Sequence, residues 1–294
     1  MRLLLLILIL FLSACEKAEE KTVPTAKTTI AVTNFPLKWI AETLLEDATL
    51  VNYPITPDID PAFWEPSKED LQSLLQNKKI LTNGATYEKW LETAELPQSK
   101  LVDTSVALKD DYVIIKDAVT HEHDGDKHSH DGTAFTTWLQ EEFMIAQINS
   151  VSQELQKVFP EKKDSIVAKE KQLITQISEL HKNLKTVFSE RKKFLASHPI
   201  YQYLAQDNEL EILSFLWEPD AMPAPEQWKE FIDKKGHSQY MLWEDEPLPE
   251  VAEKLHRAGI KVIVFRQCGN IPPSRDYIKE MQQNINNVSK ALNP

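Results

Sequence analysis

Hydrophobic residues along the chain fall into short apolar runs separated by longer amphipathic stretches. In the first half, apolar runs predict four strands, over residues 29–33, 50–53, 80–82 and 112–115. Between them, apolar residues at three- and four-residue intervals predict helices over residues 36–45, 67–76 and 87–94. This alternation of strands and helices is typical of a parallel sheet covered by helices.

The second half of the chain repeats the same pattern. Its predicted strands cover residues 194–196, 211–215, 240–243 and 261–265. Its predicted helices lie around Tyr201 and over residues 225–235, 249–258 and 274–292. The repetition predicts an α/β fold with two similar lobes, each a parallel sheet flanked by helices. Because no strand is followed by a glycine-rich phosphate loop, nucleotide binding is not expected.

A long amphipathic stretch over residues 161–192 separates the two patterns. Its apolar residues recur at helical spacing: Ile166, Val167, Leu173, Ile174, Ile177, Leu180, Leu184, Val187 and Phe188. We expect one rigid helix of roughly 45 Å that joins an N-terminal lobe (28–160) to a C-terminal lobe (193–294) and limits their relative motion. A coiled coil is the alternative, and the globular patterns on both sides argue against it.

The N-terminus carries an export signal. The apolar run over residues 3–12 is too short to span a membrane but fits a secretory signal peptide, which predicts removal of residues 1–14. Leu12-Ser13-Ala14-Cys15 resembles a bacterial lipobox, in which the cysteine is acylated. The polar segment 15–27 is then a lipidated tether. An ordinary soluble signal peptide is the alternative.

The charge and the cysteine count narrow the choice of partners. A net charge of −12 argues against binding to nucleic acid and against membrane binding through basic residues that contact anionic lipid. Membrane attachment therefore falls to the lipid on Cys15, on the periplasmic or cell-surface side of a bacterial membrane. Cys268 is the other of the two cysteines, so we expect no internal disulfide and a monomer stabilised by burial.

Half of the eight histidines lie within eleven residues. The donors of this segment are His121, His123, His128, His130 and Asp131. Imidazole and carboxylate groups at this density predict a chelating loop, over residues 118–135, for zinc or a similar divalent ion such as manganese. A solvated polar loop is the alternative.

Several short sequence strings are distributed, in a fixed order, along nearly the whole mature chain. They are TNFPL at 33–37, DPAFWEPS at 60–67, NG at 83–84, WL at 90–91 and 138–139, SHP at 197–199 with Tyr203, and Met281 with Asn284. Together they resemble the zinc/manganese solute-binding proteins of ABC importers, the ZnuA/TroA-like family. The resemblance implies a two-lobe fold that binds a metal ion without catalysis and delivers it to an ABC permease.

The same resemblance implies a degenerate central site. Family members usually hold one ion between the lobes with three histidines and a carboxylate. Carried over position by position, the histidines become Ala62, Thr136 and His198, and the carboxylate falls at or near Arg266. Alanine cannot ligate, threonine is a poor ligand, and arginine places a fixed positive charge where a dication would sit. Of the four positions, only His198 keeps its donor.

Two interpretations of this loss stay open, and a third is set aside. In the first, zinc binds at a relocated site formed by the 121–131 loop with His198 and Cys268 as a soft donor. In the second, the cleft binds a non-metal ligand or a protein partner, with Arg266 facing Glu65, Glu218 or an anionic solute. The third is catalysis by His198 with Glu244 or Glu65, for which the chain carries no supporting motif; we expect no enzyme.

Other residues have a functional and an ordinary interpretation. Four tryptophans near predicted strand or loop ends either line an apolar cleft or pack in the core: Trp64, Trp138, Trp217 and Trp243. His181, His237 and His256 are expected to be solvated, as is the acidic run over residues 244–246. His198 lies between a strand and a helix, where α/β folds place ligands, but it also suits a capping role.

Overall fold

The computed structural model describes residues 28–115, 120–123, 126–129 and 132–293, with side chains for 28–115 and 132–293. The predicted signal peptide, Cys15 and the tether lie outside these residues, as do His130 and Asp131. Within the described part of the chain, no helix is both long enough and apolar enough to cross a bilayer.

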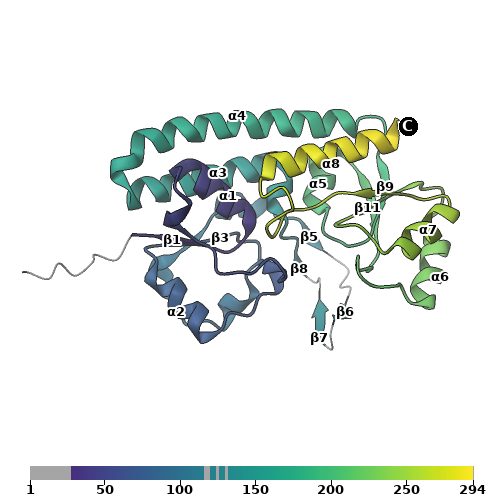
Figure 1. Cartoon of the computed structure of the whole chain (residues 1–294), viewed down its shortest axis with the longest axis horizontal. Helices are drawn as coiled ribbons and strands as arrows, with labels where there is room; N and C mark the ends of the chain where they lie inside the picture. The colour runs from purple at the N-terminus through teal and green to yellow at the C-terminus, as the bar shows by residue number, and fades with distance from the viewer. Residues whose placement is uncertain (1–27, 116–119, 124–125, 130–131, 294) are drawn as a thin grey trace, which may run out of the picture.

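The N-terminal lobe is built on a four-stranded parallel sheet in the order β2-β1-β3-β4 (Figure 1). Its strands are β1 (Ile30–Val32), β2 (Val51–Asn52), β3 (Ile80–Thr82) and β4 (Leu101–Asp103). Three of the four predicted strands are confirmed. The prediction over 112–115 was wrong, because β5 (Ile114–Ile115) pairs antiparallel with β8 (Gly132–Thr133) outside this sheet. The fourth strand is the short β4, which has two apolar residues and was not predicted.

Local capping sets where the first two helices begin. Helix α1 (Phe35–Leu45) starts after Asn34, whose side chain accepts a hydrogen bond from the backbone N–H of Leu37 at 3.0 Å. Helix α2 (Lys68–Gln76) starts after a capping box of Ser67 and Asp70. Both helices confirm the prediction to within one residue. The helix predicted over 87–94 was wrong, since only a 3-10 turn, Lys89–Glu92, forms there.

The C-terminal lobe repeats the same sheet order, as β10-β9-β11-β12, again all parallel. Its strands are β9 (Lys193–Ala196), β10 (Glu211–Ser214), β11 (Tyr240–Trp243) and β12 (Lys261–Val264). Its helices are α5 (Gln202–Asn208), α6 (Pro225–Lys234), α7 (Pro249–Arg257) and α8 (Tyr277–Leu292). The predicted α/β class with two similar lobes is therefore confirmed.

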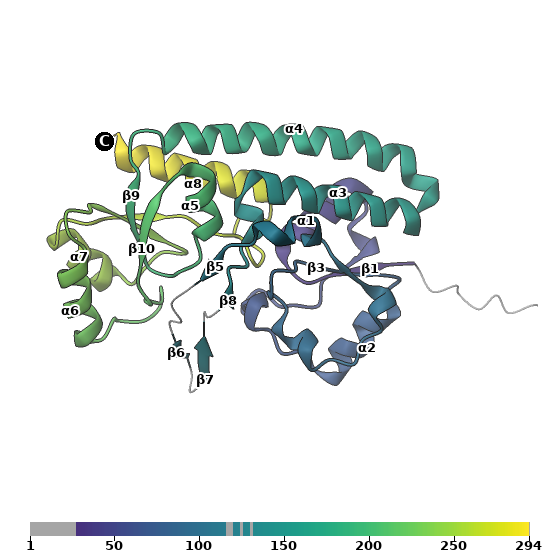
Figure 2. The ribbon, with the colours of Figure 1, turned by 180° about the vertical axis from the view of Figure 1, so that it is seen from behind.

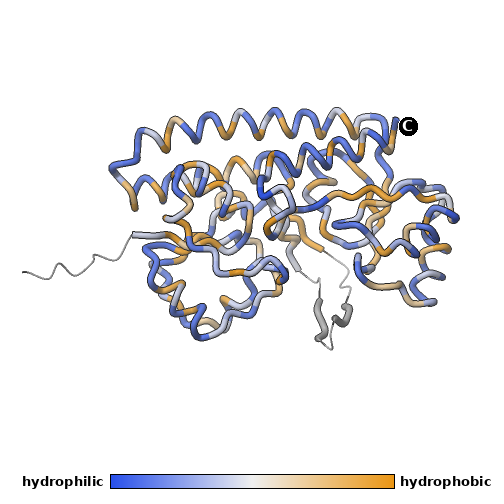
Figure 3. Tube along the Cα trace, in the orientation of Figure 1, coloured by the Kyte–Doolittle hydropathy of each residue, from blue (hydrophilic) through white to orange (hydrophobic). Residues whose placement is uncertain are grey.

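Helix α4 (Lys163–Val187) runs along both lobes (Figures 1 and 2). Its 25 residues give a length of about 37 Å, shorter than expected because a 3-10 turn precedes it and a turn follows it. Hydrophobic positions recur along it at regular intervals (Figure 3), and it packs against α3 (Glu141–Val158), α1 and α8.

Further 3-10 turns connect these elements: Ala48–Leu50, Pro61–Phe63, Gln98–Lys100, Val106–Asp111, Thr137–Leu139 and Pro160–Lys162.

The two lobes share one hydrophobic core. A single cluster of buried residues contains Ile30 of the first lobe, Ile177 of α4, and Phe265 and Met281 of the second lobe. Two smaller clusters each belong to one lobe. Wide separation of the lobes would expose this shared core to water, so the fold favours small local movements over hinge opening.

His181 was predicted to be solvated, and this prediction was wrong. Its side chain is 1% exposed, and its Nδ1 lies 2.7 Å from Oδ2 of Asp207 on α5. The reason is helical spacing, since His181 follows Ile177 by four residues and precedes Leu184 by three on the buried face of α4. His237 and His256 are exposed, as predicted.

The histidine-rich segment is more regular than the predicted loop. Strand β6 (Thr120–His123) pairs antiparallel with β7 (Asp126–Ser129), and the register places His121 opposite His128.

Candidate metal centre

Three adjacent strands of the C-terminal lobe each deliver one potential ligand at the same edge. His198 follows β9 by two residues, Glu218 follows β10 by four, and Glu244 directly follows β11. Because β9 lies between β10 and β11 in a parallel sheet, the carboxyl ends of the three strands meet. The fold therefore brings together three side chains that lie far apart in the sequence.

Backbone hydrogen bonds past the strand ends position these loops. The N–H of Ser197 donates to the carbonyl of Leu242 at 2.9 Å, and the N–H of Trp217 donates to the carbonyl of Ser197 at 2.9 Å. Glu218 and His198 are each the next residue along the chain. The loops that carry them are thus tied to each other one residue before the ligand.

The side-chain geometry suits a metal ion. The Nδ1 atom of His198 lies 3.3 Å from Oε1 of Glu218 and 3.7 Å from Oε1 of Glu244. One ligand atom from each of the three residues lies within 4.8 Å of the others. Ligands at about 2.1 Å from a tetrahedral ion are separated by roughly 3.4 Å, so small side-chain movements would complete this arrangement.

The environment of the group favours a positive charge. Burial, together with the negative charges of Asp60, Glu218 and Asp245, raises the pKa of Glu244 to about 8. His198 is 7% exposed, and the side chains of Glu218 and Glu244 are each 24% exposed, so the group is only partly hydrated. A divalent cation would relieve the repulsion and keep the carboxylates ionised.

A pocket of about 260 Å³ lies between the lobes next to this group. The N-terminal lobe contributes residues 57–61, and the C-terminal lobe contributes Glu244, Asp245 and residues 266–273. Asp60 therefore faces Glu244 across the boundary between the lobes. Of the three donors, Glu244 lines the pocket, and it lies 3.7 Å from Nδ1 of His198.

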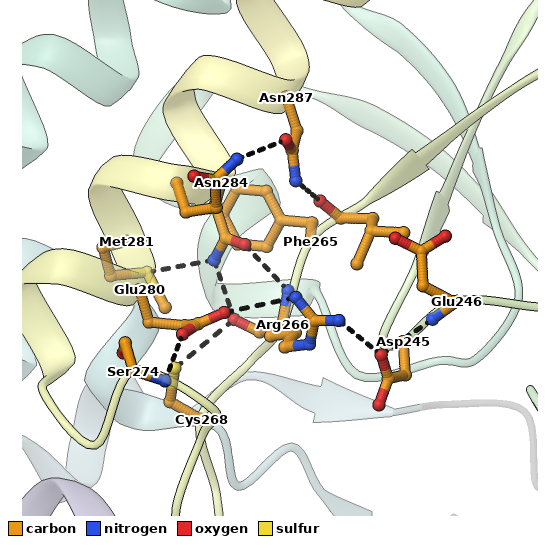
Figure 4. Close-up of polar contacts among 12 residues, drawn as sticks. Asp245, Glu246, Phe265, Arg266, Cys268, Ser274, Glu280, Met281, Asn284 and Asn287 are labelled. Atoms are coloured by element: carbon orange, nitrogen blue, oxygen red, sulfur yellow. Dashed lines mark hydrogen bonds and ion pairs between the residues drawn. The ribbon is translucent and has the colours of Figure 1, made fainter.

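Arg266 lines the same pocket, but its charge is neutralised (Figure 4). Its guanidinium pairs with Asp245 at 2.5 Å and with Glu280 at 3.3 Å. The expected partners, Glu65 and Glu218, were wrong. Asp245 follows β11 and Arg266 follows β12. Because these two strands are parallel neighbours, their carboxyl ends bring the two side chains together. Asn284 holds the Arg266 backbone on both sides, accepting from its N–H at 3.0 Å and donating to its carbonyl at 2.8 Å.

The remaining family positions lie outside the group around His198. Ala62 is buried in a 3-10 turn, where its N–H donates to Oδ1 of Asp60 at 2.9 Å. Thr136 is 1% exposed, and its hydroxyl donates to the carbonyl of Ile200 at 2.7 Å. Ala62 is therefore held within its own turn, whereas Thr136 bonds to the backbone of the C-terminal lobe.

Cys268 lines the interlobe pocket but is poorly suited to bind a metal ion there. Its side chain is buried, and its Sγ donates to the carbonyl of Arg266 at 3.6 Å. Burial raises the pKa of the thiol well above its usual range, so the thiolate that binds metals is disfavoured.

The tryptophans and Glu65 contribute no donor to the His198 group. Trp64 packs edge-on against Trp90, with ring centroids 5.4 Å apart, and with Glu65 lines a separate pocket of about 480 Å³ in the N-terminal lobe. Trp138, Trp217 and Trp243 are almost fully buried, which fits core packing.

The donors of the histidine-rich segment lie outside the side chains that the structure describes. For His121, His123 and His128 only the backbone of β6 and β7 is available. Ligation by these residues stays a prediction.

Sequence reasoning did not identify Glu218 and Glu244 as candidate metal ligands. The acidic run was expected to be solvated, which was wrong for Glu244, whose side chain is 24% exposed and lies beside His198. Asp245 and Glu246 are exposed, as predicted. The available signal was that Glu218 comes three residues, and Glu244 one residue, after a predicted strand. What was missing was the order of those strands in the sheet.

Comparisons with known proteins agree with this architecture. YcdH, a metal-dependent lipoprotein from Bacillus subtilis, has a TM-score of 0.73 at 19% identity, covering 90% of this chain and 99% of that one. The Zn(II)-bound ZnuA-like domain of AdcA from Streptococcus pneumoniae has a TM-score of 0.73 at 20% identity, covering 90% and 98%. An FpvC mutant from Pseudomonas aeruginosa has 0.69 at 18% identity, also covering 90% and 98%. These likenesses show the fold.

The family follows from the sequence match. Curated protein sequences give no significant match. The family model described as ZnuA, zinc-uptake complex component A, periplasmic, matches residues 30–291, which is nearly the whole described chain. The chain therefore belongs to the ZnuA family of non-catalytic solute-binding proteins.

Proposed function

We propose that this chain is the extracytoplasmic ion-binding component of a metal ABC importer, and that it holds zinc through His198, Glu218 and Glu244. The observation that carries the proposal is the convergence of these three donors at one sheet edge of a ZnuA-family fold. Imidazole nitrogen and carboxylate oxygen are both ligand types that zinc takes, and the two negative charges balance the dication. Capture and release would proceed by binding without chemical reaction.

The proposed site is both relocated and weakened relative to the one that the family resemblance implies. His198 keeps its role, while the donors lost at Ala62 and Thr136 are replaced by two carboxylates of the C-terminal lobe. Protons compete with the ion for Glu244, whose pKa of about 8 lies above neutral pH. We expect weaker binding than three histidines would give.

Two further parts of the proposal rest on the sequence. The histidine-rich segment would supply auxiliary donors that raise the local concentration of the ion near the pocket. The lipid on Cys15 would hold the chain at the outer side of a bacterial membrane, close to a permease.

The alternative of a non-metal ligand in the cleft is less well supported. Both ends of the Arg266 guanidinium are paired with carboxylates, so an anionic solute would have to displace Asp245 or Glu280. The acidic side chains of the interlobe pocket would also repel an anion.

Zinc titration by calorimetry tests the proposal, using metal-stripped residues 24–294 with and without manganese. We expect binding close to one ion per chain, and a loss of about tenfold or more in affinity for His198→Ala and Glu244→Gln. His256→Ala, on an exposed helix face, is the matched control and should bind like the unaltered chain. Equal zinc affinity in all four proteins would overturn the site.

A further inference from the structure

One side chain of the C-terminal lobe, Asn270, makes three hydrogen bonds to the N-terminal lobe. It lies in the loop after β12. Its Oδ1 accepts from the hydroxyl of Tyr53 at 2.8 Å, and its Nδ2 donates to the carbonyls of Thr56 and Ile59 at 2.8 and 2.7 Å. An asparagine amide suits this position because it donates and accepts at once.

These bonds hold the loop that ends at Asp60. Residues 56–60 are exposed, so burial contributes little to fixing their conformation. Asn270 binds this loop at its start and one residue before Asp60. The side chain of Asp60 is itself oriented by the hydrogen bond from the N–H of Ala62.

The segment 267–271, which carries Asn270, is itself hydrogen-bonded to the N-terminal lobe. The carbonyl of Gly269 accepts from the N–H of Phe35 at 2.9 Å, and the carbonyl of Gln267 accepts from Nε1 of Trp138 at 2.5 Å. The N–H of Ile271 donates to Oδ1 of Asn270 at 2.7 Å and fixes its side chain. The segment from 267 to 271 therefore forms a rigid support for the loop.

Asp60 lies on the N-terminal side of the interlobe pocket, outside the three donors whose ligand atoms lie within 4.8 Å of one another. It lines the interlobe pocket together with Glu244, and its charge is the largest charge effect on that carboxyl group. With His198 and Glu218, it would bring the donor count to four, which is the usual number for zinc.

We propose that Asn270 is an interlobe latch that holds Asp60 over the metal centre as its fourth donor. The inference rests on the proposed function of the His198 group. Because the lobes share a core, the ion cannot leave by wide separation of the lobes, and release requires the loop carrying Asp60 to lift. Asn270 is a positioning residue, which sets how fast the ion exchanges.

The kinetic test compares zinc dissociation from the unaltered chain and four variants into an excess of chelator. Asn270→Ala removes all three bonds, and we expect dissociation to be about tenfold faster or more. Asn270→Asp keeps the acceptor for Tyr53 but loses both donated bonds, so it should behave similarly. Asp60→Asn should also speed release. Asn286→Ala, at an exposed asparagine on α8, is the control and should leave the rate unchanged.

Non-additivity distinguishes positioning from a general structural effect. If Asn270 acts by holding Asp60, adding Asn270→Ala to Asp60→Asn should increase the dissociation rate little beyond the single variants. Rate effects that multiply would show that Asn270 acts by another route and would overturn the latch.

Amide hydrogen exchange of the ion-free chain separates this inference from the proposed function. Asn270→Ala should accelerate exchange over residues 56–62 by about tenfold or more and leave the strands of both lobes unchanged. Unchanged exchange and unchanged zinc release would overturn the latch, even where His198→Ala still abolishes binding. Unchanged binding in His198→Ala would instead remove the proposed site, and the role of Asp60 with it.

Discussion

The carboxylate of Glu244 lies 3.7 Å from the imidazole Nδ1 of His198, although 46 positions separate the two residues in the sequence. The contact arises because β9 and β11 are parallel neighbours whose ends meet at one edge. It places a charged donor beside the histidine that the family resemblance retains. The group around His198 is thereby a candidate metal centre of this chain.

Replacement of Glu218 tests whether the metal centre depends on the carboxylate that follows β10, as well as on the one that follows β11. Glu218→Gln removes one negative charge and one strong donor, and we expect zinc affinity to fall by about tenfold or more in calorimetry. Glu211→Gln, on the exposed face of the same strand, should leave the affinity unchanged. Equal effects of the two changes would point to a nonspecific loss of negative charge.

The order of strands marks the limit of what the sequence predicts. Seven of the eight strands of the two sheets were predicted, because runs such as 240–243 and 261–265 are apolar on both faces. The sequence could not predict that β9 would lie between β10 and β11, and that placement creates the His198 group. Glu244 was misread for this reason, since a glutamate beside two other acidic residues is usually solvated.

The hydrogen-bonded contacts between the lobes are equally invisible in the sequence. Asn270 lies in a polar loop with no periodicity, and its partners Tyr53, Thr56 and Ile59 lie more than two hundred positions away. Only the packing of one lobe on the other brings them together. The family strings marked Ala62 and Arg266 as lost donors, but they carried no information about Asp60.

Arg266 is expected to be important for stability. Arg266→Met leaves Glu280, whose side chain is 4% exposed, without its cationic partner, and we expect the free energy of unfolding to fall by about 3 kcal/mol. Arg257→Met, which breaks an exposed pair with Glu253, should cost less than about 1 kcal/mol. Denaturant unfolding followed by tryptophan fluorescence measures both, and a similar small loss in each would show that the buried pair contributes little.

Glu88 makes stability depend on pH. Burial raises its pKa from 4.5 to about 7, and hydrogen bonds from Thr33, Asn83 and Gly84 only partly oppose the effect. Between these values the folded chain keeps a proton that the unfolded chain has lost, so the free energy of unfolding falls as pH rises. The expected decrease is about 3 kcal/mol, complete near pH 7.

Unfolding of Glu88→Gln at several pH values isolates this contribution from other titrating groups. The variant cannot ionise at this position, so its free energy of unfolding should rise relative to the unaltered chain as pH increases from about 4.5 to 7. Glu92→Gln, at an exposed site on the same turn, should track the unaltered chain at every pH. A constant difference between Glu88→Gln and the unaltered chain would contradict the prediction.

Deletion of the histidine-rich segment shows whether zinc affinity depends more on that segment or on the His198 group. If the His198 group is the metal centre, His198→Ala should lose more zinc affinity than removal of residues 121–130, which should mainly reduce the number of weakly bound ions. The relocated-loop hypothesis predicts the reverse order, because the loop would then supply most of the donors. Calorimetry of both variants and of their combination decides between them: a deletion that abolishes binding while His198→Ala binds normally would place the metal centre in the loop.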